Sequence, residues 1–358
     1  MAPSQQRAIS IPPFYCPLEP AVHDHVDEID PPVVDWLVST GVREYGSWLQ
    51  KVNATRFACL CFPFTTNPRA EAISRLLYLL GAWDDDLEDD PHRREPAALA
   101  QEVSGLIRAF ELPGSAHSSP RPYERAMASL RRGLAPHMTT TQYAWFLEEL
   151  RRFFFAVLAK NITDAREELL DLGQYLTLRM ADVAGLWMSA LVPIAGGYEL
   201  PTAWAHEPHV RALCETSSTL LALDNDVLSY DREALQGNFL QHIYPVLMAR
   251  DALTLPEAVR ATRRIRDRIM TVHLQIRQQV LSSAPSAEVA RFAATVGYIV
   301  RGNITWSATT HRFTHPQHPG TKQEIDLGDH ALTWADKPYD ASTAPLDIPA
   351  VIPWWDLT

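Results

Sequence analysis

The stretch from Ile73 to Asp90 reads ISRLLYLLGAWDDDLEDD, an apolar segment that runs directly into six carboxylates. Its apolar residues Ile73, Leu76, Leu77 and Leu80 recur at steps of three and four, the spacing that places side chains on one face of an α-helix. The alternation typical of a half-buried strand is missing. The stretch therefore predicts a buried helix whose last turns carry a dense negative charge.

The same helical spacing extends through most of the chain and predicts an all-α fold. It recurs, for example, in Ile265, Ile269, Val272, Ile276 and Val280. We expect one large bundle of about ten helices around a central cavity, with no strand pair. Two capping-box spacings predict helix starts, at Asp164 with Glu167 and at Thr254 with Glu257.

Prolines divide the chain into three parts because they cluster at both ends. We expect a Pro-rich N-terminal segment over residues 1–32, a helical domain over residues 33–314 and a Pro-rich tail over residues 315–358. The tail has no helical or strand periodicity, so we expect it to be mobile. Its tryptophans, Trp354 and Trp355, favour docking across the helical body, near the mouth of the cavity.

Composition excludes several classes of function. The chain has 358 residues, with 43 acidic and 32 basic side chains and a formal net charge of −11. It carries no run of Lys and Arg, so we expect no nucleic-acid partner. No stretch of about 18 apolar residues and no signal peptide occur, which predicts a cytoplasmic protein without a membrane span. The glycine spacings of dinucleotide-binding, P-loop and hydrolase motifs are also missing from the sequence.

The acidic run offers oxygen ligands for a divalent cation. Asp84 and Glu88 are four residues apart, so on a continuing helix they share one face. Carboxylate oxygens are the ligands that Mg²⁺ prefers. A solvated run of charge where a helix leaves the core explains the same residues, and this alternative stays open for the motif alone.

A second polar line lies on a hydrophobic helix. Asn225, Ser229 and Glu233 follow each other at steps of four, and the flanking residues are apolar. An amide oxygen, a hydroxyl and a carboxylate on one face suit Mg²⁺. Hydrogen bonds between buried helices are the alternative explanation. Together the two motifs indicate a Mg²⁺ cluster around a polyphosphate in an all-helical protein.

On these two motifs the chain resembles the bacterial class I terpene synthases, over roughly residues 14–314. Their signatures are an aspartate-rich DDxx(x)D/E motif, here starting at Asp84, and an NDxxSxxxE triad, here starting at Asn225. The acidic motif can be read from Asp84 or from Asp85, and we prefer the first. The resemblance implies the class I terpenoid synthase fold and a set of ligands for three Mg²⁺ ions, namely Asp84, Asp85, Glu88, Asn225, Ser229 and Glu233.

The resemblance also assigns residues to the diphosphate. Arg179 stands where the family has its diphosphate sensor, Asp182 where it has the linker, and Val183 where many relatives have glycine. Arg232 precedes the glutamate of the triad. Near the end of the helical region the family has a tryptophan and an Arg-Tyr pair, and this chain has Trp306 followed by Arg312 and Phe313, without the tyrosine hydroxyl.

The implied reaction is Mg²⁺-dependent ionisation of a prenyl diphosphate, farnesyl before geranylgeranyl diphosphate, followed by cyclisation to a terpene. Aromatic rings attract carbocations, and we expect these to line the cavity: Phe57, Phe62, Phe64, Trp83, Trp187 and Trp306. The resemblance also allows a homodimer. Two alternatives stay open: a noncatalytic isoprenoid- or diphosphate-binding protein, and a chain-elongating prenyl diphosphate synthase, which would need a second DDxxD motif.

Overall fold

Helices build almost the whole protein in the computed structural model. It describes residues 9–89, 94–114, 121–237, 240–316, 324–328 and 330–358, and it leaves out the side chains of Glu88 and Asp89. Ten of the helices in this part of the chain have eleven or more residues, which confirms the predicted all-α bundle. The bounds are α1 Val26–Ser39, α2 Ser47–Val52, α3 Ala54–Cys61, α4 Asn67–Asp89, α5 Pro96–Glu111, α6 Pro122–Leu134, α7 Thr140–Ala165, α8 Leu172–Asp182, α9 Gly185–Gly196, α10 Thr202–Ala205, α11 Pro208–Gln236, α12 Ile243–Asp251, α13 Leu255–Ser283, α14 Ala287–Thr309 and α15 His311–Thr314.

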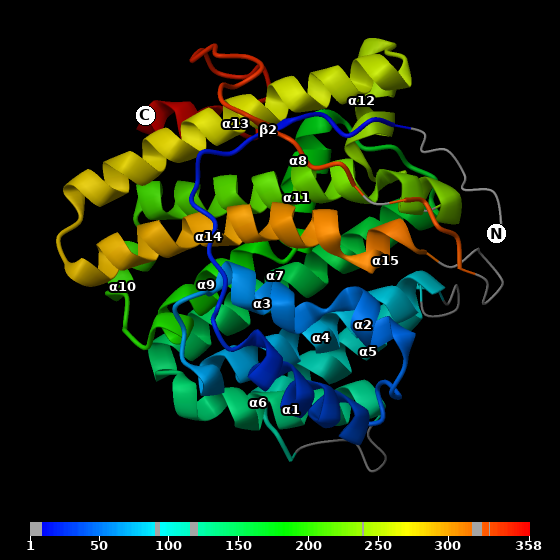
Figure 1. Cartoon of the computed structure of the whole chain (residues 1–358), viewed down its shortest axis with the longest axis vertical. Helices are drawn as coiled ribbons and strands as arrows, with labels where there is room; N and C mark the ends of the chain where they lie inside the picture. Colours follow the sequence, from blue (N-terminus) through cyan, green and yellow to red (C-terminus); the bar gives the residue numbers. More distant parts are fainter. Residues whose placement is uncertain (1–8, 90–93, 115–120, 238–239, 317–323, 329) are drawn as a thin grey trace.

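The helices lie in successive layers across the molecule (Figure 1). Helix α13 packs on α11, α11 on α14, α14 on α3, and α3 on α4. Helix α11 is buried on nearly every side over its middle turns, and α9 is buried from Gly185 to Ala195. These two helices therefore form the centre of the core, and α11 carries the predicted metal triad there.

One apolar stretch of the chain is 25 residues long. Leu172–Gly196, which covers α8 and α9, is long and apolar enough to cross a membrane by composition alone. However, 72% of its most apolar window is buried inside the protein. The stretch therefore belongs to the buried core of the bundle.

The helical region begins earlier than the predicted boundary at residue 33. Helix α1 starts at Val26 and contains Pro31 and Pro32. Both prolines are exposed, so the carbonyl groups that lose an amide partner can bond to water. The Thr254 capping box is present, with Thr254 N donating to Glu257 at 2.8 Å. Asp164 instead lies near the end of α7, so the helix start predicted there is wrong.

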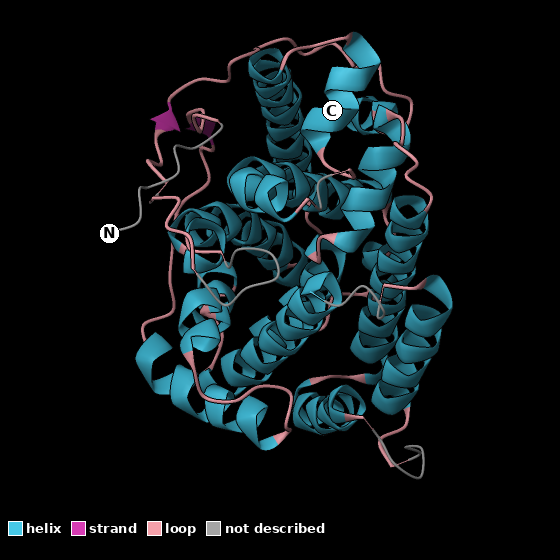
Figure 2. Cartoon of the chain, turned by 90° about the vertical axis from the view of Figure 1, so that its right-hand side faces the viewer, coloured by secondary structure: helices cyan, strands magenta, loops and turns pink. Residues whose placement is uncertain are grey.

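Two short strands from distant parts of the chain contact arginines of α13 and α14: Arg266 donates to the Tyr15 carbonyl, and the Arg301 guanidinium lies 3.4 Å from the centre of the Trp334 ring. Strand β1 (Phe14–Tyr15) pairs in parallel with β2 (Trp334–Ala335), at the edge of the helical body in Figure 2, so the expectation of no strand pair is wrong. The tail continues to η2 (Ile352–Leu357), where Trp354 and Trp355 are buried and Trp354 Nε1 donates to Glu215 at 3.0 Å.

The end of the tail thus docks on the helical body as expected, whereas nearer its start Glu324 pairs at 2.6 Å with Lys51, the residue before the cavity-lining Val52. None of its residues within 324–328 and 330–358 lines the central cavity described below. The apolar groups of η2 find cover against α11 and α13 instead.

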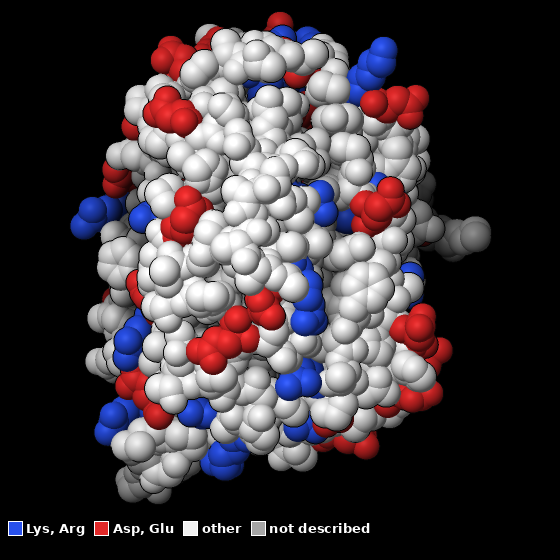
Figure 3. Space-filling model, turned by 90° about the vertical axis from the view of Figure 1, so that its left-hand side faces the viewer, with Lys and Arg blue, Asp and Glu red and all other residues white. Residues whose placement is uncertain are grey.

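Charges of both signs are scattered over the face shown in Figure 3. This face has no broad basic patch of the kind that would contact a nucleic acid.

Candidate active site

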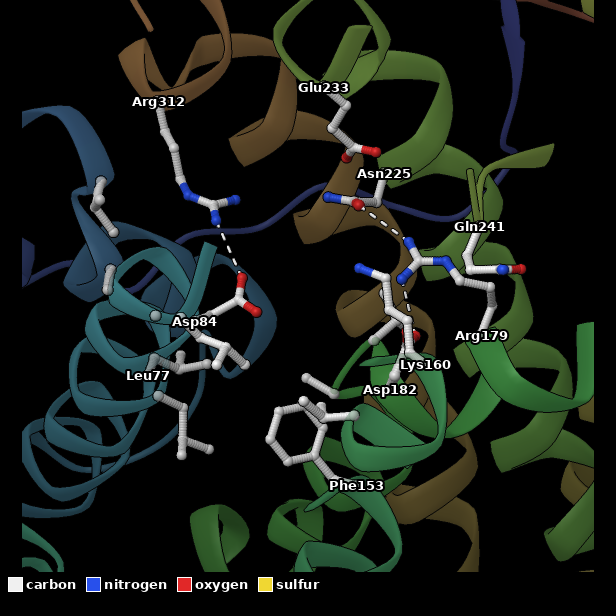
Figure 4. A pocket seen from close by; sticks show the side chains of 18 of the residues that line it. Leu77, Asp84, Phe153, Lys160, Arg179, Asp182, Asn225, Glu233, Gln241 and Arg312 are labelled. Atoms are coloured by element: carbon white, nitrogen blue, oxygen red, sulfur yellow. Dashed lines mark hydrogen bonds and ion pairs between the residues drawn. The ribbon is translucent and has the colours of Figure 1, made fainter. Parts of the chain in front are cut away.

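A cavity lies where the ends of α4, α7, α8, α11 and α14 approach one another. Each helix contributes one face to it. Its lining includes Leu77, Leu80, Gly81, Asp84 and Leu87 from α4; Phe153, Val157, Lys160, Asn161 and Asp164 from α7; Arg179 and Asp182 from α8; Asn225, Arg232 and Glu233 from α11. Figure 4 shows Asp84 and Arg312 on one wall, Asn225, Glu233 and Arg179 on the opposite wall, and Leu77 and Phe153 at the apolar end.

The three aspartates of the acidic motif point in different directions. Asp84 lines the cavity, where Arg312 Nη2 lies 3.1 Å from its Oδ2. Asp85 is buried and accepts hydrogen bonds from Arg312 Nε at 2.9 Å and Arg232 Nη2 at 3.2 Å. Burial would raise the pKa of Asp85, but the two arginines outweigh it and lower the pKa to about 2. Asp85 is therefore an ionised anchor for both arginines.

Asp86 is not among the lining residues and pairs with Arg43 at 2.5 Å, so of the three aspartates only Asp84 lines the cavity. Asp85, which we expected to bind metal, has both oxygens in contact with protein donors. Glu88 shares the helix face of Asp84 by spacing, but its side chain lies outside the described part of the structure.

The triad on α11 faces the acidic motif across the cavity. Asn225 and Glu233 line the cavity, and both point into it in Figure 4. Ser229 is buried behind them, and its hydroxyl donates to Glu233 Oε1 at 2.5 Å. The structure thus brings the three side chains together along one line of the helix, as the spacing predicts.

Arg179 is held by two carboxylates. Its Nη1 donates to Asp182 at 2.8 Å, and its Nη2 donates to Asp226 at 2.7 Å and to Asn225 Oδ1 at 3.3 Å. Asp226 is fully buried and also accepts from the Tyr175 hydroxyl and from Ile243 N at 2.8 Å. Burial would raise the pKa of Asp226, but the charge of Arg179 lowers it.

Asp226 therefore aims Arg179 at the triad, a role that the sequence analysis did not assign. The signal was present in the sequence, since Asp226 is a carboxylate on a helix that is otherwise buried.

A sharp break separates α8 from α9 beside Arg179. Helix α8 ends at Asp182 with Val183 as its C-cap, and Ala184 adopts a left-handed conformation with φ of +77°. That conformation costs a non-glycine residue about 1–2 kcal/mol. Gly185 follows, where an added Cβ would lie 2.4 Å from Ser218 Oγ. The break therefore forms although Val183 replaces the glycine of many relatives, and close packing requires the glycine two positions later.

The other two arginines assigned to the diphosphate by resemblance reach the cavity from two other elements. Arg232 and Arg312 line it together with Trp306. Trp306 is fixed by a hydrogen bond from its Nε1 to Val52 O at 2.8 Å, and the buried ring of Phe313 packs against it at 5.7 Å. Phe313 is not among the lining residues of this cavity.

Comparison with known proteins identifies the family. The profile of the family described as "Terpene synthase family 2, C-terminal metal binding" matches residues 75–272, more than half of the chain. The chain belongs to the terpene synthase family. It is a terpene cyclase that acts on a prenyl diphosphate, and this finding favours an enzyme over the noncatalytic alternative.

Its relatives match most of the length of this terpene synthase. Bonnadiene synthase of Allokutzneria albata is 27% identical over 99% of this chain and 100% of that protein. A (+)-T-muurolol synthase of Streptomyces clavuligerus, named as cyclizing farnesyl diphosphate, is 29% identical over 85% of this chain and 73% of that protein. The crystal structure of SVS_A2, a reconstructed ancestral protein, matches with a TM-score of 0.85 and 30% identity over 98% and 100% of the two chains.

Half of the aromatic residues expected in the cavity of this terpene synthase lie elsewhere. Phe57, Trp187 and Trp306 line it, and Phe57 stacks on Trp306 at 4.6 Å between ring centroids. The other three expectations are wrong. Trp83 is buried away from the cavity and donates to Glu102 at 2.9 Å, Phe62 is buried in the core, and Phe64 is 73% exposed against Tyr298.

Several cavity residues were missed in the sequence. Phe153, Lys160 and Asp164 come from α7, and Gln241 follows α11; all four line the cavity. Figure 4 shows Lys160 beside Arg179 and Asp182. The helical spacing of the α7 residues was visible in the sequence, but nothing local indicates which face of α7 meets the cavity.

The polar walls suit a hard divalent cation. The family is described as metal binding, and the donors that converge here are oxygens of Asp84, Asn225, Ser229 and Glu233. Within the described residues, no three His, Cys, Asp or Glu side chains form one compact cluster. The ligand sets instead lie on opposite walls and include an amide and a hydroxyl, so they fit ions held between the walls.

Proposed function

We propose that the protein is a Mg²⁺-dependent cyclase that converts a linear prenyl diphosphate into a cyclic terpene and releases diphosphate. Farnesyl diphosphate is the first-choice substrate and geranylgeranyl diphosphate the second. The observation that carries this proposal is the pair of polar walls, from α4 and α11, facing each other above an apolar end of one cavity. The family and the farnesyl-cyclizing relative support it.

The metal-binding residues in this proposal are Asp84, with Glu88 on the same helix face, and Asn225, Ser229 and Glu233. When bound, Mg²⁺ ions, three by family resemblance, supply positive charge that stabilises the departing diphosphate. Asp85 was expected to bind metal. In this proposal it instead holds Arg232 and Arg312 at the edge of the cavity.

Three arginines of the chain complete the diphosphate site. Arg179, Arg232 and Arg312 line the cavity, and each is held by a carboxylate. Charge-assisted hydrogen bonds from such oriented guanidinium groups stabilise the negative charge that grows on the leaving oxygen. Because the carboxylates hold the arginines in advance, little reorganisation is needed when the bond breaks.

The apolar end shapes and protects the carbocation. Phe57, Phe153, Trp187 and Trp306 present aromatic rings there, and Leu77, Leu80 and Val157 fill the remaining wall. Aromatic faces stabilise a cation without attacking it, and exclusion of water prevents premature capture as an alcohol.

Incubation with C10, C15 and C20 prenyl diphosphates, with and without Mg²⁺, tests the proposal. We expect Mg²⁺-dependent cyclic hydrocarbons, mainly from the C15 substrate, detected by gas chromatography and mass spectrometry. Glu233→Gln is the matched control, since it keeps the shape of the side chain and removes its charge. A folded protein that forms no product from any of the three, or that forms longer linear diphosphates with an added C5 unit, would contradict it.

A further inference from the structure

The part of α4 from Ala82 to Asp86 is held from outside by a segment that precedes it in the sequence. Arg43 follows α1, and Trp48 lies in α2. Arg43 Nη2 donates to the Ala82 carbonyl at 2.9 Å and pairs with Asp86 Oδ1 at 2.5 Å. One side chain thus grips both the backbone and a carboxylate of the turn that carries Asp84.

Trp48 completes this grip. Its indole Nε1 donates to Asp85 Oδ2 at 2.8 Å. The ring also contacts two neighbours, since the Arg43 guanidinium lies 4.6 Å and the Tyr78 ring 6.2 Å from its centre. The indole N–H is therefore held in place before it meets the carboxylate.

A third donor comes from helix α6. The Tyr123 hydroxyl donates to Asp86 Oδ2 at 2.5 Å, while Arg43 holds Oδ1 of the same carboxylate. Both oxygens of Asp86 are thereby held by residues that do not line the cavity, and Asp84 is the aspartate that faces into it.

We propose that Trp48 is a positioning residue for the diphosphate site, which it controls through Asp85; this inference rests on the proposed function. Trp48 holds Oδ2 of Asp85, so Oδ1 is turned toward Arg312 and Arg232. Without the indole N–H, the carboxylate can rotate, and both arginines lose the fixed acceptor that aims them.

A positioning role and a purely structural role of Trp48 predict different results. If Trp48 only fills space, removing its N–H lowers stability and leaves the site intact. If it positions Asp85, the loss appears in binding of Mg²⁺ and diphosphate even when the protein is fully folded. The chain offers a matched control in Trp36, whose Nε1 donates to Ser129 at 3.0 Å and whose ring lies 5.5 Å from the Arg75 guanidinium.

The experiment compares Trp48→Phe with Trp36→Phe in the full chain. Each substitution removes one indole hydrogen bond and keeps an aromatic ring. Calorimetric titration with inorganic diphosphate in the presence of Mg²⁺ measures binding, and thermal unfolding measures stability. We expect Trp48→Phe to weaken diphosphate binding about tenfold, which corresponds to the loss of a hydrogen bond to a charged group. Trp36→Phe should bind within about twofold of wild type.

A second variant approaches the same turn with less risk to folding. Tyr123→Phe removes only a hydroxyl, and we expect about threefold weaker diphosphate binding because Arg43 still holds Asp86. Equal diphosphate affinity in wild type, Trp48→Phe and Trp36→Phe would overturn the positioning role, while terpene formation by the wild type would remain unaffected. Conversely, a wild type that binds diphosphate and forms no terpene would contradict the proposed function and leave the binding comparison valid.

Discussion

Replacing Asp226 by asparagine separates residues that hold the site together from residues that bind the substrate. Asp226 is fully buried and accepts hydrogen bonds from Arg179 at 2.7 Å, from Ile243 N at 2.8 Å and from the Tyr175 hydroxyl. An amide of the same shape places an NH₂ group against these donors. It also removes the negative charge that balances Arg179.

The expected loss of stability follows from this burial. Breaking one side of a buried ion pair costs about 3–5 kcal/mol. An unfolding entropy of about 2.1 cal/mol/K per residue corresponds to about 0.75 kcal/mol/K for 358 residues. Asp226→Asn should therefore lower the midpoint of thermal unfolding by about 4–7 °C, and turnover should also fall because Arg179 is no longer aimed at the triad.

The adjacent residue is the control. Asn225 lines the cavity and accepts one long hydrogen bond, at 3.3 Å from Arg179. Asn225→Ala should shift the midpoint by less than about 2 °C and reduce turnover by about 100-fold or more, because it removes a proposed metal ligand. Scanning calorimetry and product formation from farnesyl diphosphate measure both effects. If Asp226→Asn unfolds within 1 °C of wild type, or Asn225→Ala is destabilised as strongly, the division of roles described above is wrong.

Three further outcomes follow from the structure. Asp84→Asn should reduce turnover by about 100-fold with little change in stability, whereas Asp86→Asn should mainly lower the unfolding midpoint because it loosens Arg43 and Tyr123; the reverse order would refute the register starting at Asp84. Burial lowers the pKa of His273 to about 3, and the charges of Arg277 and Arg266 lower it in the same direction. Below about pH 6.5 this imidazole is therefore protonated in the unfolded chain but stays neutral in the native protein. Stability should then fall by about 1.4 kcal/mol per pH unit as pH drops from 6.5, and His273→Gln should lose about 2 kcal/mol less than wild type between pH 7 and pH 5 in denaturant titrations. Removing residues 331–358 should lower the unfolding midpoint by several degrees, because Trp354 and Trp355 are buried, while products stay the same in gas chromatography; additional alcohol products would show that the tail keeps water out of the cavity.

Local sequence signals predicted the helices well and their ends less well. The spacing of apolar residues in α4 and α13 is strong because each helix has one polar side. Capping-box spacing was less reliable. It marks the start of α13 at Thr254, but at Asp164 it falls at the end of α7, where the carboxylate lines the cavity and caps no helix. Only the packing of neighbouring helices distinguishes the two.

The strand pair and the contacts that the docked tail makes could not be predicted, since each depends on contacts between distant parts of the chain. Strand β1 is two residues long and is held by partners about 250 to 320 residues away, including Arg266, which donates to the Tyr15 carbonyl, and Trp334. A two-residue strand has no periodicity to detect. Its stability comes from the surface of α13 and α14, which the sequence does not display locally.

Helices α4 and α7 show which cavity residues can be predicted from the sequence and which cannot. On α4 the lining residues Leu77, Leu80, Gly81, Asp84 and Leu87 follow steps of three and four, so the face of α4 was determined once Asp84 was chosen. Trp83 lies about 100° around the same helix and therefore points away from that face, toward Glu102. The prediction that Trp83 lines the cavity was wrong because it was inconsistent with the helical spacing from Asp84. Helix α7 is different. Phe153, Val157 and Lys160 form an equally regular face, but α7 carries no motif that says which face meets the substrate, so its contribution emerges only when α4, α8 and α11 pack around it.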